Sequence, residues 1–162
     1  MIRAAFFALL LFVSHIATAD DFSGQVVRIA DGDTITVLDA NKTQHKIRLA
    51  GIDAPERKQP YGEASRKHLA SLIAGKTVSV EWSKRDKYRR IVGVVVYQGM
   101  DVNLEQIKMG YAWHYKKYEA EQTPNDRMTY ADAEQSARIK HMGLWKDSNP
   151  MPPWDWRKTQ SP

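Results

Sequence analysis

Five short stretches of the chain are rich in β-forming apolar residues, and in two of them, residues 45–52 and 78–82, apolar and polar side chains alternate with the period of a half-buried β-strand. Turn-forming residues such as Asp31-Gly32-Asp33 separate the stretches, because glycine and aspartate adopt the backbone conformations that tight turns need. The last stretch is a continuous apolar run, which suits a strand buried on both faces. The expected strands cover residues 24–30, 34–38, 45–52, 78–82 and 91–97.

The period changes to that of an amphipathic helix between the third and fourth strands. From Tyr61 to Ile73, apolar and small residues recur at i, i+3, i+4 and i+7, and Gly75 follows as a stop. Asn103 is the expected N-cap of a second, short helix, and Pro124 fits the first turn of a third. The expected helices cover residues 61–73, 103–110 and 124–142, and irregular chain is expected from residue 146 onward.

Five strands with a helix inserted after the third are typical of a small, strongly bent β-barrel with helices outside it. The pattern favours an α+β, mainly β fold, namely a five-stranded oligonucleotide/oligosaccharide-binding barrel (OB-fold) with about three peripheral helices. We expect this domain over residues 20–146, followed by a tail at 147–162 that is rich in proline and tryptophan.

Residues 1–19 have the three-part pattern of a secretory signal peptide. Arg3 gives a basic start, an apolar run extends from residue 4 to residue 13, and alanines occupy positions 17 and 19. An uncleaved membrane anchor is the less favoured alternative, because the run is shorter than the roughly 20 residues that span a bilayer. We expect cleavage after Ala19 and a periplasmic or secreted protein, with no stable membrane association afterwards.

The composition excludes several kinds of site. The chain has no cysteine, which rules out disulfides, thiolate metal sites and cysteine nucleophiles. Its histidines show no H-E-x-x-H spacing, and neither a G-x-S-x-G motif nor a P-loop is present, so a serine hydrolase or an NTPase is unsupported. The formal net charge of +5 points toward polyanionic partners such as nucleic acid or an acidic membrane surface.

Two aspartates twenty positions apart, Asp33 and Asp53, are the first candidates for chemistry. In an antiparallel hairpin of the second and third strands, Asp33 is expected opposite roughly Gly51 and therefore beside Asp53. Like charges this close raise each other's pKa unless a cation lies between them, and oxygen ligands suit Ca²⁺ or Mg²⁺. The alternative is that both are ordinary turn residues, since aspartate hydrogen-bonds its own backbone.

Glu56 and Arg48 belong to the same region of the chain. Glu56 follows Asp53 by three residues, and a carboxylate next to a metal site can act as general base toward water. Arg48 is unusual among the apolar residues of a strand, and its planar guanidinium suits a bidentate contact with phosphate. The alternatives are a solvated loop glutamate and an arginine on the outer face of the strand.

Basic and aromatic residues interleave in two segments, 84–90 and 113–118. Aromatic rings provide platforms on which bases stack, and cations bind phosphates, so this mixture is what single-stranded nucleic-acid binding needs. A charge run by itself is more often plain solvated surface.

Four short motifs follow one another along the chain, and together they are far more specific than any one alone. They are Ile-Ala-Asp-Gly-Asp-Thr at 29–34, Ile-Arg-Leu-Ala-Gly-Ile-Asp-Ala-Pro-Glu at 47–56, Tyr-Gly-Glu-Ala-Ser at 61–65 and Asp-Lys-Tyr-Arg-Arg at 86–90. With these motifs the chain resembles the staphylococcal-type thermonucleases, the micrococcal nuclease-like (SNase-like) family. The resemblance covers about residues 22–146.

The resemblance implies an OB-fold barrel and Ca²⁺-dependent hydrolysis of DNA and RNA to products with 3′-phosphate ends. A groove in which bases stack on aromatic rings favours single-stranded or A·T-rich substrate, since only unpaired bases can stack on protein. The Ca²⁺ ligands carried over by position are Asp33, Asp53 and the backbone carbonyl of Ala54.

The resemblance also assigns catalytic and substrate-binding residues. The catalytic residues would be Arg48 and Arg90, which bind the scissile phosphate, and Glu56, the general base for the attacking water. The residues that would contact the substrate beside them are Lys87, Tyr88, Tyr115 and Tyr118. Ala54 stands where the family often has threonine and Arg89 where it often has glycine, and the tyrosine pair is spaced differently.

Two other functions are compatible with the sequence. The main alternative is a non-catalytic OB-fold module that binds single-stranded nucleic acid. The other is a calcium-stabilised structural domain that docks a partner through its tryptophan-containing tail, although packing of the tail onto the barrel is favoured over docking. In each case a monomer is expected.

Overall fold

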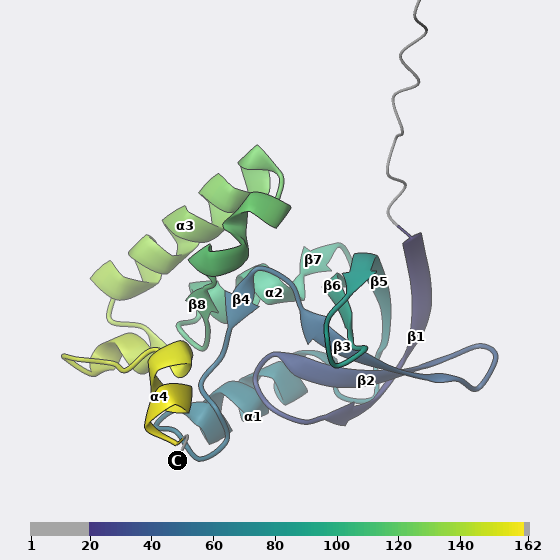
Figure 1. Ribbon diagram of the computed structural model, residues 1–162, viewed down its shortest axis with the longest axis horizontal. Coiled ribbons are helices and arrows are strands. Elements are labelled where there is room, and N and C mark those ends of the chain that lie inside the picture. The colour runs from purple at the N-terminus through teal and green to yellow at the C-terminus, as the bar shows by residue number, and fades with distance from the viewer. Residues whose placement is uncertain (1–19, 161–162) are drawn as a thin grey trace, which may run out of the picture.

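Five strands curve into a closed barrel in the computed structural model, which describes residues 20–160 (Figure 1). Neighbouring strands pair antiparallel in the order β3-β2-β1-β5-β6, and a parallel pairing of β3 with β6 closes the barrel. The predicted α+β fold with a five-stranded OB-type barrel is confirmed. The barrel strands are β1 (Asp20–Ile29), β2 (Thr34–Asp39), β3 (Gln44–Leu49), β5 (Thr77–Arg85) and β6 (Ile91–Tyr97).

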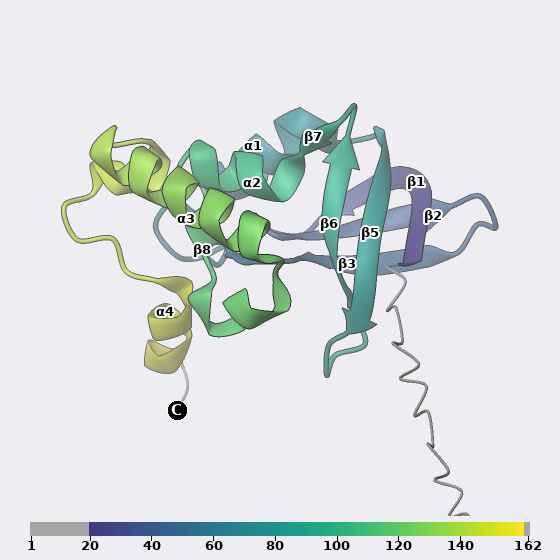
Figure 2. The same ribbon diagram turned by 90° about the horizontal axis from the view of Figure 1, so that it is seen from above.

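Helices and short strands lie outside the barrel, mostly to one side of it (Figure 2). The short strands are β4 (Ile52–Asp53), β7 (Met100–Asp101) and β8 (Trp113–His114), of which β4 and β8 pair with each other. The α-helices are α1 (Gly62–Ile73), α2 (Val102–Lys108), α3 (Pro124–Ile139) and α4 (Pro153–Thr159). Two 3₁₀-helices, η1 (Lys116–Glu121) and η2 (Gly143–Lys146), flank α3.

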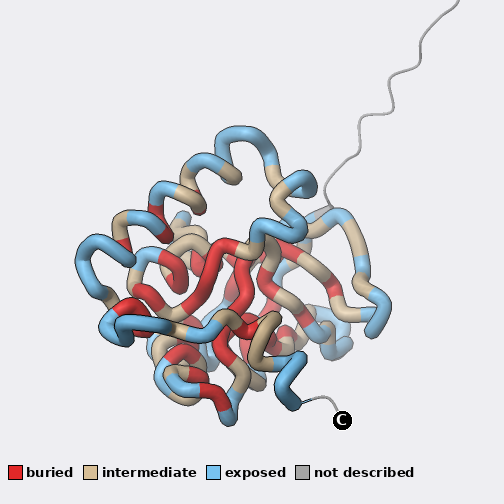
Figure 3. Tube along the Cα trace, turned by 60° about the vertical axis from the view of Figure 1, so that its left-hand side comes forward, coloured by how far each residue is buried: buried red, intermediate tan, exposed pale blue. Residues whose placement is uncertain are grey.

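The core fills the barrel and continues under the helices (Figure 3). Inward-facing positions alternate along each strand, and Ile35 of β2 lies opposite Ile47 of β3, both without exposed surface. α1 and α2 cover the barrel with fully buried apolar side chains of their own. The largest buried side chains of this core include Ile35, Ile47, Leu49, Ile52, Leu69, Ile73, Ile91 and Ile107.

The predicted strand at residues 45–52 is wrong in one respect, because the structure divides it in two. β3 ends at Leu49, and Gly51 turns the chain with a φ of 72°, a conformation that glycine adopts without strain. The chain then enters β4, which leaves the barrel and pairs with β8. This turn places Asp53 at the mouth of the barrel instead of in the sheet.

Asn103 is not the N-cap of α2, as the sequence predicted. Asp101 caps the helix by accepting a hydrogen bond from the backbone N–H of Leu104. Asn103 is instead fully buried, where its amide accepts from the N–H of Val95 and donates to the carbonyls of Ala50 and Gly93. It therefore ties α2 to the middle of β6 and to the turn that follows β3.

The C-terminal tail is helical from residue 153 to residue 159, so the prediction of an irregular tail is wrong. Pro153 occupies the first turn of α4, where its missing N–H costs nothing. Trp154 stacks on Tyr115, with ring centroids 5.6 Å apart and 7° between the planes, and meets Trp113 edge-on at 5.5 Å. The tail thus packs back onto the chain around β8, as the sequence favoured.

The third helix also ends earlier than expected, at Ile139, and η2 follows from Gly143. The predicted signal peptide, residues 1–19, lies outside the described residues. Within residues 20–160, no helix has the length and apolar character needed to cross a membrane.

Candidate active site

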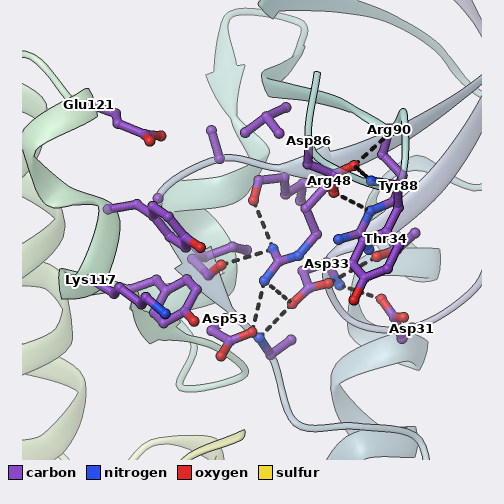
Figure 4. A pocket seen from close by; sticks show the side chains of 18 of the residues that line it. Asp31, Asp33, Thr34, Arg48, Asp53, Asp86, Tyr88, Arg90, Lys117 and Glu121 are labelled. Carbon is purple, nitrogen blue, oxygen red and sulfur yellow. Dashed lines mark hydrogen bonds and ion pairs between the residues drawn. The ribbon is translucent and has the colours of Figure 1, made fainter. Parts of the chain in front are cut away.

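A cleft of about 700 Å³ opens where β2 begins and β3 and β4 end, between the β5–β6 loop and η1. Asp33 enters from the loop before β2, Arg48 from β3, and Asp53 from β4 (Figure 4). The cleft brings together all ten residues that the sequence analysis singled out. They are Asp33, Arg48, Asp53, Ala54, Glu56, Lys87, Tyr88, Arg90, Tyr115 and Tyr118.

Arg48 joins the two aspartates at the floor of the cleft. Its Nη2 lies 2.8 Å from Asp53 Oδ1 and 3.2 Å from Asp33 Oδ2, and its Nη1 donates to the carbonyls of Leu49 and Ile52 (Figure 4). Its side chain is only 14% exposed, so it does not lie on the outer face of the strand. The two carboxylates meet as predicted, although the backbone opposite Asp33 is that of Leu49, not Gly51.

Asp33 is also held by the chain that follows β4. The backbone N–H of Ala54 donates to Asp33 Oδ2 at 2.7 Å, and Thr34 Oγ1 donates to Asp33 Oδ1 at 3.0 Å. The carboxylate oxygens of Asp33 and Asp53 are the type of ligand that a hard cation such as Ca²⁺ or Mg²⁺ prefers. No group of three or more His, Asp or Glu side chains placed to hold a metal occurs in residues 20–160. A cation bound here would therefore need backbone carbonyls and water besides the two aspartates.

A third carboxyl, that of Asp31, borders the same cleft and was assigned only a turn role from the sequence. Burial, followed by repulsion from Asp33, raises the pKa of Asp31 to about 7. Burial also raises the pKa of Asp53, against the opposing effect of the hydrogen bond from Arg157. The carboxyl groups of Asp31, Asp33 and Asp53 thus lie close together at the floor of the cleft, and a bound cation would stabilise their charged forms.

The β5–β6 loop presents Arg90 across the cleft, and Asp86 holds it there. Asp86 accepts hydrogen bonds from Arg90 Nε at 2.7 Å and from the backbone N–H groups of Tyr88 and Arg90, both at 2.9 Å. Burial acts to raise the pKa of Asp86, but the hydrogen bonds from Arg90 outweigh it and the pKa lies below its usual range. Arg89, where the family often has glycine, adopts a φ of 65°.

Aromatic and basic side chains form the walls of the cleft. Tyr88 is 68% exposed, with Lys87 Nζ 5.0 Å and the Arg90 guanidinium carbon 5.5 Å from its ring centroid. On the other side, Tyr115 and Tyr118 meet edge-on with centroids 5.1 Å apart. Such surfaces offer a nucleic acid both rings for its bases and cations for its phosphates.

Arg157 of α4 is, besides Asp31, a residue of the cleft that the sequence analysis missed. Its guanidinium donates to Asp53 Oδ2 at 2.8 Å and to Glu56 Oε1 at 2.9 Å. These partners precede it by about a hundred residues, so no local motif links them. The only sequence indication was a cationic residue beside the tryptophans of the tail.

The guanidiniums of Arg48 and Arg90 can bind a phosphate, and the buried carboxylates of Asp33 and Asp53 can bind a cation beside it. Glu56 lies at the edge of the cleft with its carboxylate accessible to water. These groups are the ones that attack of water on a phosphodiester requires. A module that only binds nucleic acid has no use for the two buried carboxylates, which repel phosphate.

Comparison with known proteins gives a consistent result. The family model described as "Staphylococcal nuclease homologue" matches residues 46–147. A protein named "Uncharacterized endonuclease" from Escherichia coli is 46% identical over 138 residues, which cover 85% of this chain and 86% of the relative. A "Micrococcal nuclease" from Shigella flexneri is 41% identical over 166 residues, covering 97% and 92% of the two chains. A further "Uncharacterized endonuclease", from Haemophilus influenzae, is 41% identical over 136 residues, covering 84% of this chain and 73% of the relative.

The family model covers Asp53, Glu56 and the β5–β6 loop, and the Shigella flexneri relative covers 97% of the chain, so sequence and geometry lead to one conclusion. They favour catalysis over the alternative of a non-catalytic binding module. The chain belongs to the staphylococcal nuclease family and is a hydrolytic nuclease that acts on nucleic acid.

Proposed function

We propose that the protein is a Ca²⁺-dependent nuclease that is exported and hydrolyses DNA and RNA to 3′-phosphate products, with single strands preferred. The observation that carries this proposal is the meeting of Asp33 and Asp53 around Arg48, with Arg90 on the opposite wall of the same cleft. In this cleft the two carboxylates are complementary to a cation, and the two guanidiniums are complementary to a phosphate.

The residues that would hold Ca²⁺ are Asp33, Asp53 and the backbone carbonyl of Ala54. Bound there, the cation would neutralise charge on the phosphoryl oxygens. Calcium is favoured over transition metals because the donors are oxygens only and the cleft offers no thiolate or clustered imidazole.

The chain's own side chains carry the remaining steps. Arg48 and Arg90 bind the non-bridging oxygens of the scissile phosphate and stabilise the charge that grows on them during attack. Glu56 accepts the proton of the attacking water at its carboxylate. Cleavage of the bond between phosphorus and the 5′ oxygen leaves a 3′-phosphate on one product and a 5′-hydroxyl on the other.

Substrate preference follows from the walls of the cleft. Tyr88, Tyr115 and Tyr118 can stack on bases only where those bases are unpaired, whereas a duplex hides them. Single-stranded DNA and RNA therefore gain contacts in this cleft that a stable duplex cannot make.

The first test incubates the chain of residues 20–162 with heat-denatured DNA, in Ca²⁺ and separately in excess EGTA. Digestion with Ca²⁺ that stops in EGTA supports the proposal, and 5′-hydroxyl ends are detected by direct labelling with a polynucleotide kinase. Equal digestion in both tubes would refute the dependence on Ca²⁺. Intact DNA in both, with folded protein, would refute the nuclease assignment of this cleft.

Export has a separate test. The full chain of 162 residues is expressed in a Gram-negative bacterium, and the protein is sought in the periplasm and the medium. A mature N-terminus at Asp20 is expected. An unprocessed chain that still begins at Met1 and stays in the cytoplasm would contradict export.

A further inference from the structure

Arg157 connects the C-terminal helix to both carboxylates on which the proposed chemistry depends. Its Nη2 donates to Asp53 Oδ2 at 2.8 Å, while its Nη1 donates to Glu56 Oε1 at 2.9 Å and to Asp53 Oδ1 at 3.3 Å. Arg48 contacts Asp53 Oδ1 from the other side at 2.8 Å. Both oxygens of Asp53 are therefore engaged by guanidinium groups.

A divalent cation would use one of the same carboxylates, that of Asp53. Asp53 is the proposed ligand and Glu56 the proposed base, and Arg157 donates hydrogen bonds to both. A cation bound to Asp53 Oδ2 would lie close to the Arg157 guanidinium, and two positive charges at such short range repel each other. Occupation of this carboxylate by Arg157 therefore opposes its occupation by the cation.

The placement of Arg157 allows it to leave. Its side chain is 42% exposed, and that of Glu56 is 39% exposed, so both can be solvated when they separate. The ion pair between Arg157 and Glu56 is therefore worth little, because water screens it. The side chain of Asp53 is only 1% exposed, so this carboxylate needs another positive charge when Arg157 leaves, and the cation would supply it.

We propose that Arg157 sets the metal affinity of the active site by competing with the divalent cation for Asp53, while it also pairs with Glu56. The inference rests on the proposed function, because it takes Asp53 as a metal ligand. Arg157 is a positioning residue in this scheme: it neutralises the two carboxylates until the cation replaces it. Displacement of Arg157 then also releases Glu56 to accept a proton from water.

The test measures the Kd for Ca²⁺ by isothermal titration calorimetry on residues 20–162, without nucleic acid. Arg157→Gln removes the competing guanidinium and is expected to bind Ca²⁺ about tenfold more tightly than the wild type, corresponding to about 1.4 kcal/mol. Lys158→Gln is the matched control, since it removes one positive charge from the neighbouring position. Lys158 pairs with Asp155 on its own helix and is expected to leave the Kd within about twofold.

Arg157→Lys provides a conservative variant and a safeguard if the glutamine variant does not fold. A lysine retains the charge but loses the planar fork that spans two carboxylates. The Kd of Arg157→Lys for Ca²⁺ is therefore expected between the values of the wild type and Arg157→Gln. Circular dichroism confirms the fold of each variant.

The outcomes separate this inference from the proposed function. Tighter binding by Arg157→Gln than by Lys158→Gln supports the competition. Binding by the wild type with unchanged or weaker binding by Arg157→Gln refutes the competition alone. No binding of Ca²⁺ by wild type or variants refutes both the competition and the calcium site.

Discussion

Burial divides the carboxylates of the cleft into two kinds. The side chains of Asp33 and Asp53 are 8% and 1% exposed, whereas that of Glu56 is 39% exposed. Buried carboxylates need a compensating cation, which suits metal ligands, and an exposed carboxylate can exchange protons with water. The three residues are therefore suited to different roles by their surroundings as well as by their positions in the motif.

Glu56→Gln tests the role of the exposed carboxylate. The amide keeps the shape of the side chain but cannot take a proton, so kcat is expected to fall by about 10²–10⁴-fold. Binding of single-stranded DNA in Ca²⁺, measured by fluorescence anisotropy, should change little. Glu63→Gln, on the exposed side of α1, is the control for lost charge. Cleavage at the wild-type rate would show that Glu56 is not the base.

Asp31→Asn tests the charge crowding at the floor of the cleft. The pKa of Asp31 is raised to about 7 from 3.8, so between about pH 4 and pH 7 the folded chain holds a proton that the unfolded chain has lost. The contribution of Asp31 to stability is therefore full below about pH 4 and is lost as the pH rises toward 7. Asparagine cannot lose this proton.

The measurement compares thermal unfolding of Asp31→Asn and wild type in EGTA at pH 5 and pH 8. The difference in Tm, variant minus wild type, should be more positive at pH 8 than at pH 5. Asp132→Asn, at an exposed position of α3, serves as the control. A difference in Tm that does not vary with pH would contradict the raised pKa.

Residue-level prediction from the sequence succeeded where the partners are close along the chain. The approach of Asp33 and Asp53 follows from one hairpin, and Arg48 lies on the strand between them. Asp31 was missed as a charged member of the site because its neighbourhood depends on burial, which the turn motif does not reveal. Arg157 was missed because its partners lie about a hundred residues away.

At the scale of elements, the β5–β6 loop acts as a support for Arg90. Asp86 binds two backbone N–H groups and the Arg90 side chain, so a single carboxylate fixes both the loop and the guanidinium. The positive φ of Arg89 is compatible with this arrangement, because the N–H of Arg89 also bonds back to the carbonyl of Asp86. Preorganisation of this kind favours transition-state binding.

Asp86→Asn is expected to weaken this support. The amide can still accept backbone hydrogen bonds, but it loses the charge-assisted bond to Arg90 Nε, so kcat/KM should fall by about tenfold. The Tm should stay within a few degrees, since the loop lies outside the core. Glu81→Gln, exposed on β5 of the same hairpin, is the control. Unchanged kcat/KM would mean that Arg90 is positioned without Asp86.

The sequence predicted long, periodic elements better than short ones. α1 was recognised because its apolar stripe repeats over three turns, and the barrel strands were recognised by alternation or by runs of β-forming apolar residues. α4 was not, because seven residues contain too little periodicity and such a short helix depends on tertiary contacts. Those contacts come from Trp154 on Tyr115 and Trp113, which no local pattern indicates.

At the scale of the whole molecule, the tail belongs to the fold of the nuclease. Gln59 Nε2 donates to the carbonyl of Met151 at 2.7 Å, which links the tail to the loop that carries Glu56. Trp154 adds aromatic contacts to the wall of the cleft. The tail therefore supports both the loop that carries Glu56 and the wall of the cleft that carries Tyr115.

A stop codon after Asp147 should therefore lower stability. Loss of the tryptophan contacts and of the Gln59 hydrogen bond is expected to reduce the Tm by about 5 °C, since about 1 kcal/mol corresponds to a few degrees in a chain of this size. A chain that ends at Gln160 is the control. Equal Tm values for the two chains, measured by circular dichroism, would show that the tail does not contribute to the fold.

The parallel seam between β3 and β6 determines when during synthesis the cleft can first form. Arg48 lies opposite Val92 across this seam, so Arg48 and the neighbouring Arg90 come together only when the barrel closes. A nascent chain that stops before residue 91 already contains Asp33, Asp53 and Glu56, yet it lacks β6 and cannot close the barrel. A cleft with both arginines in place therefore forms only after the last barrel strand has been made.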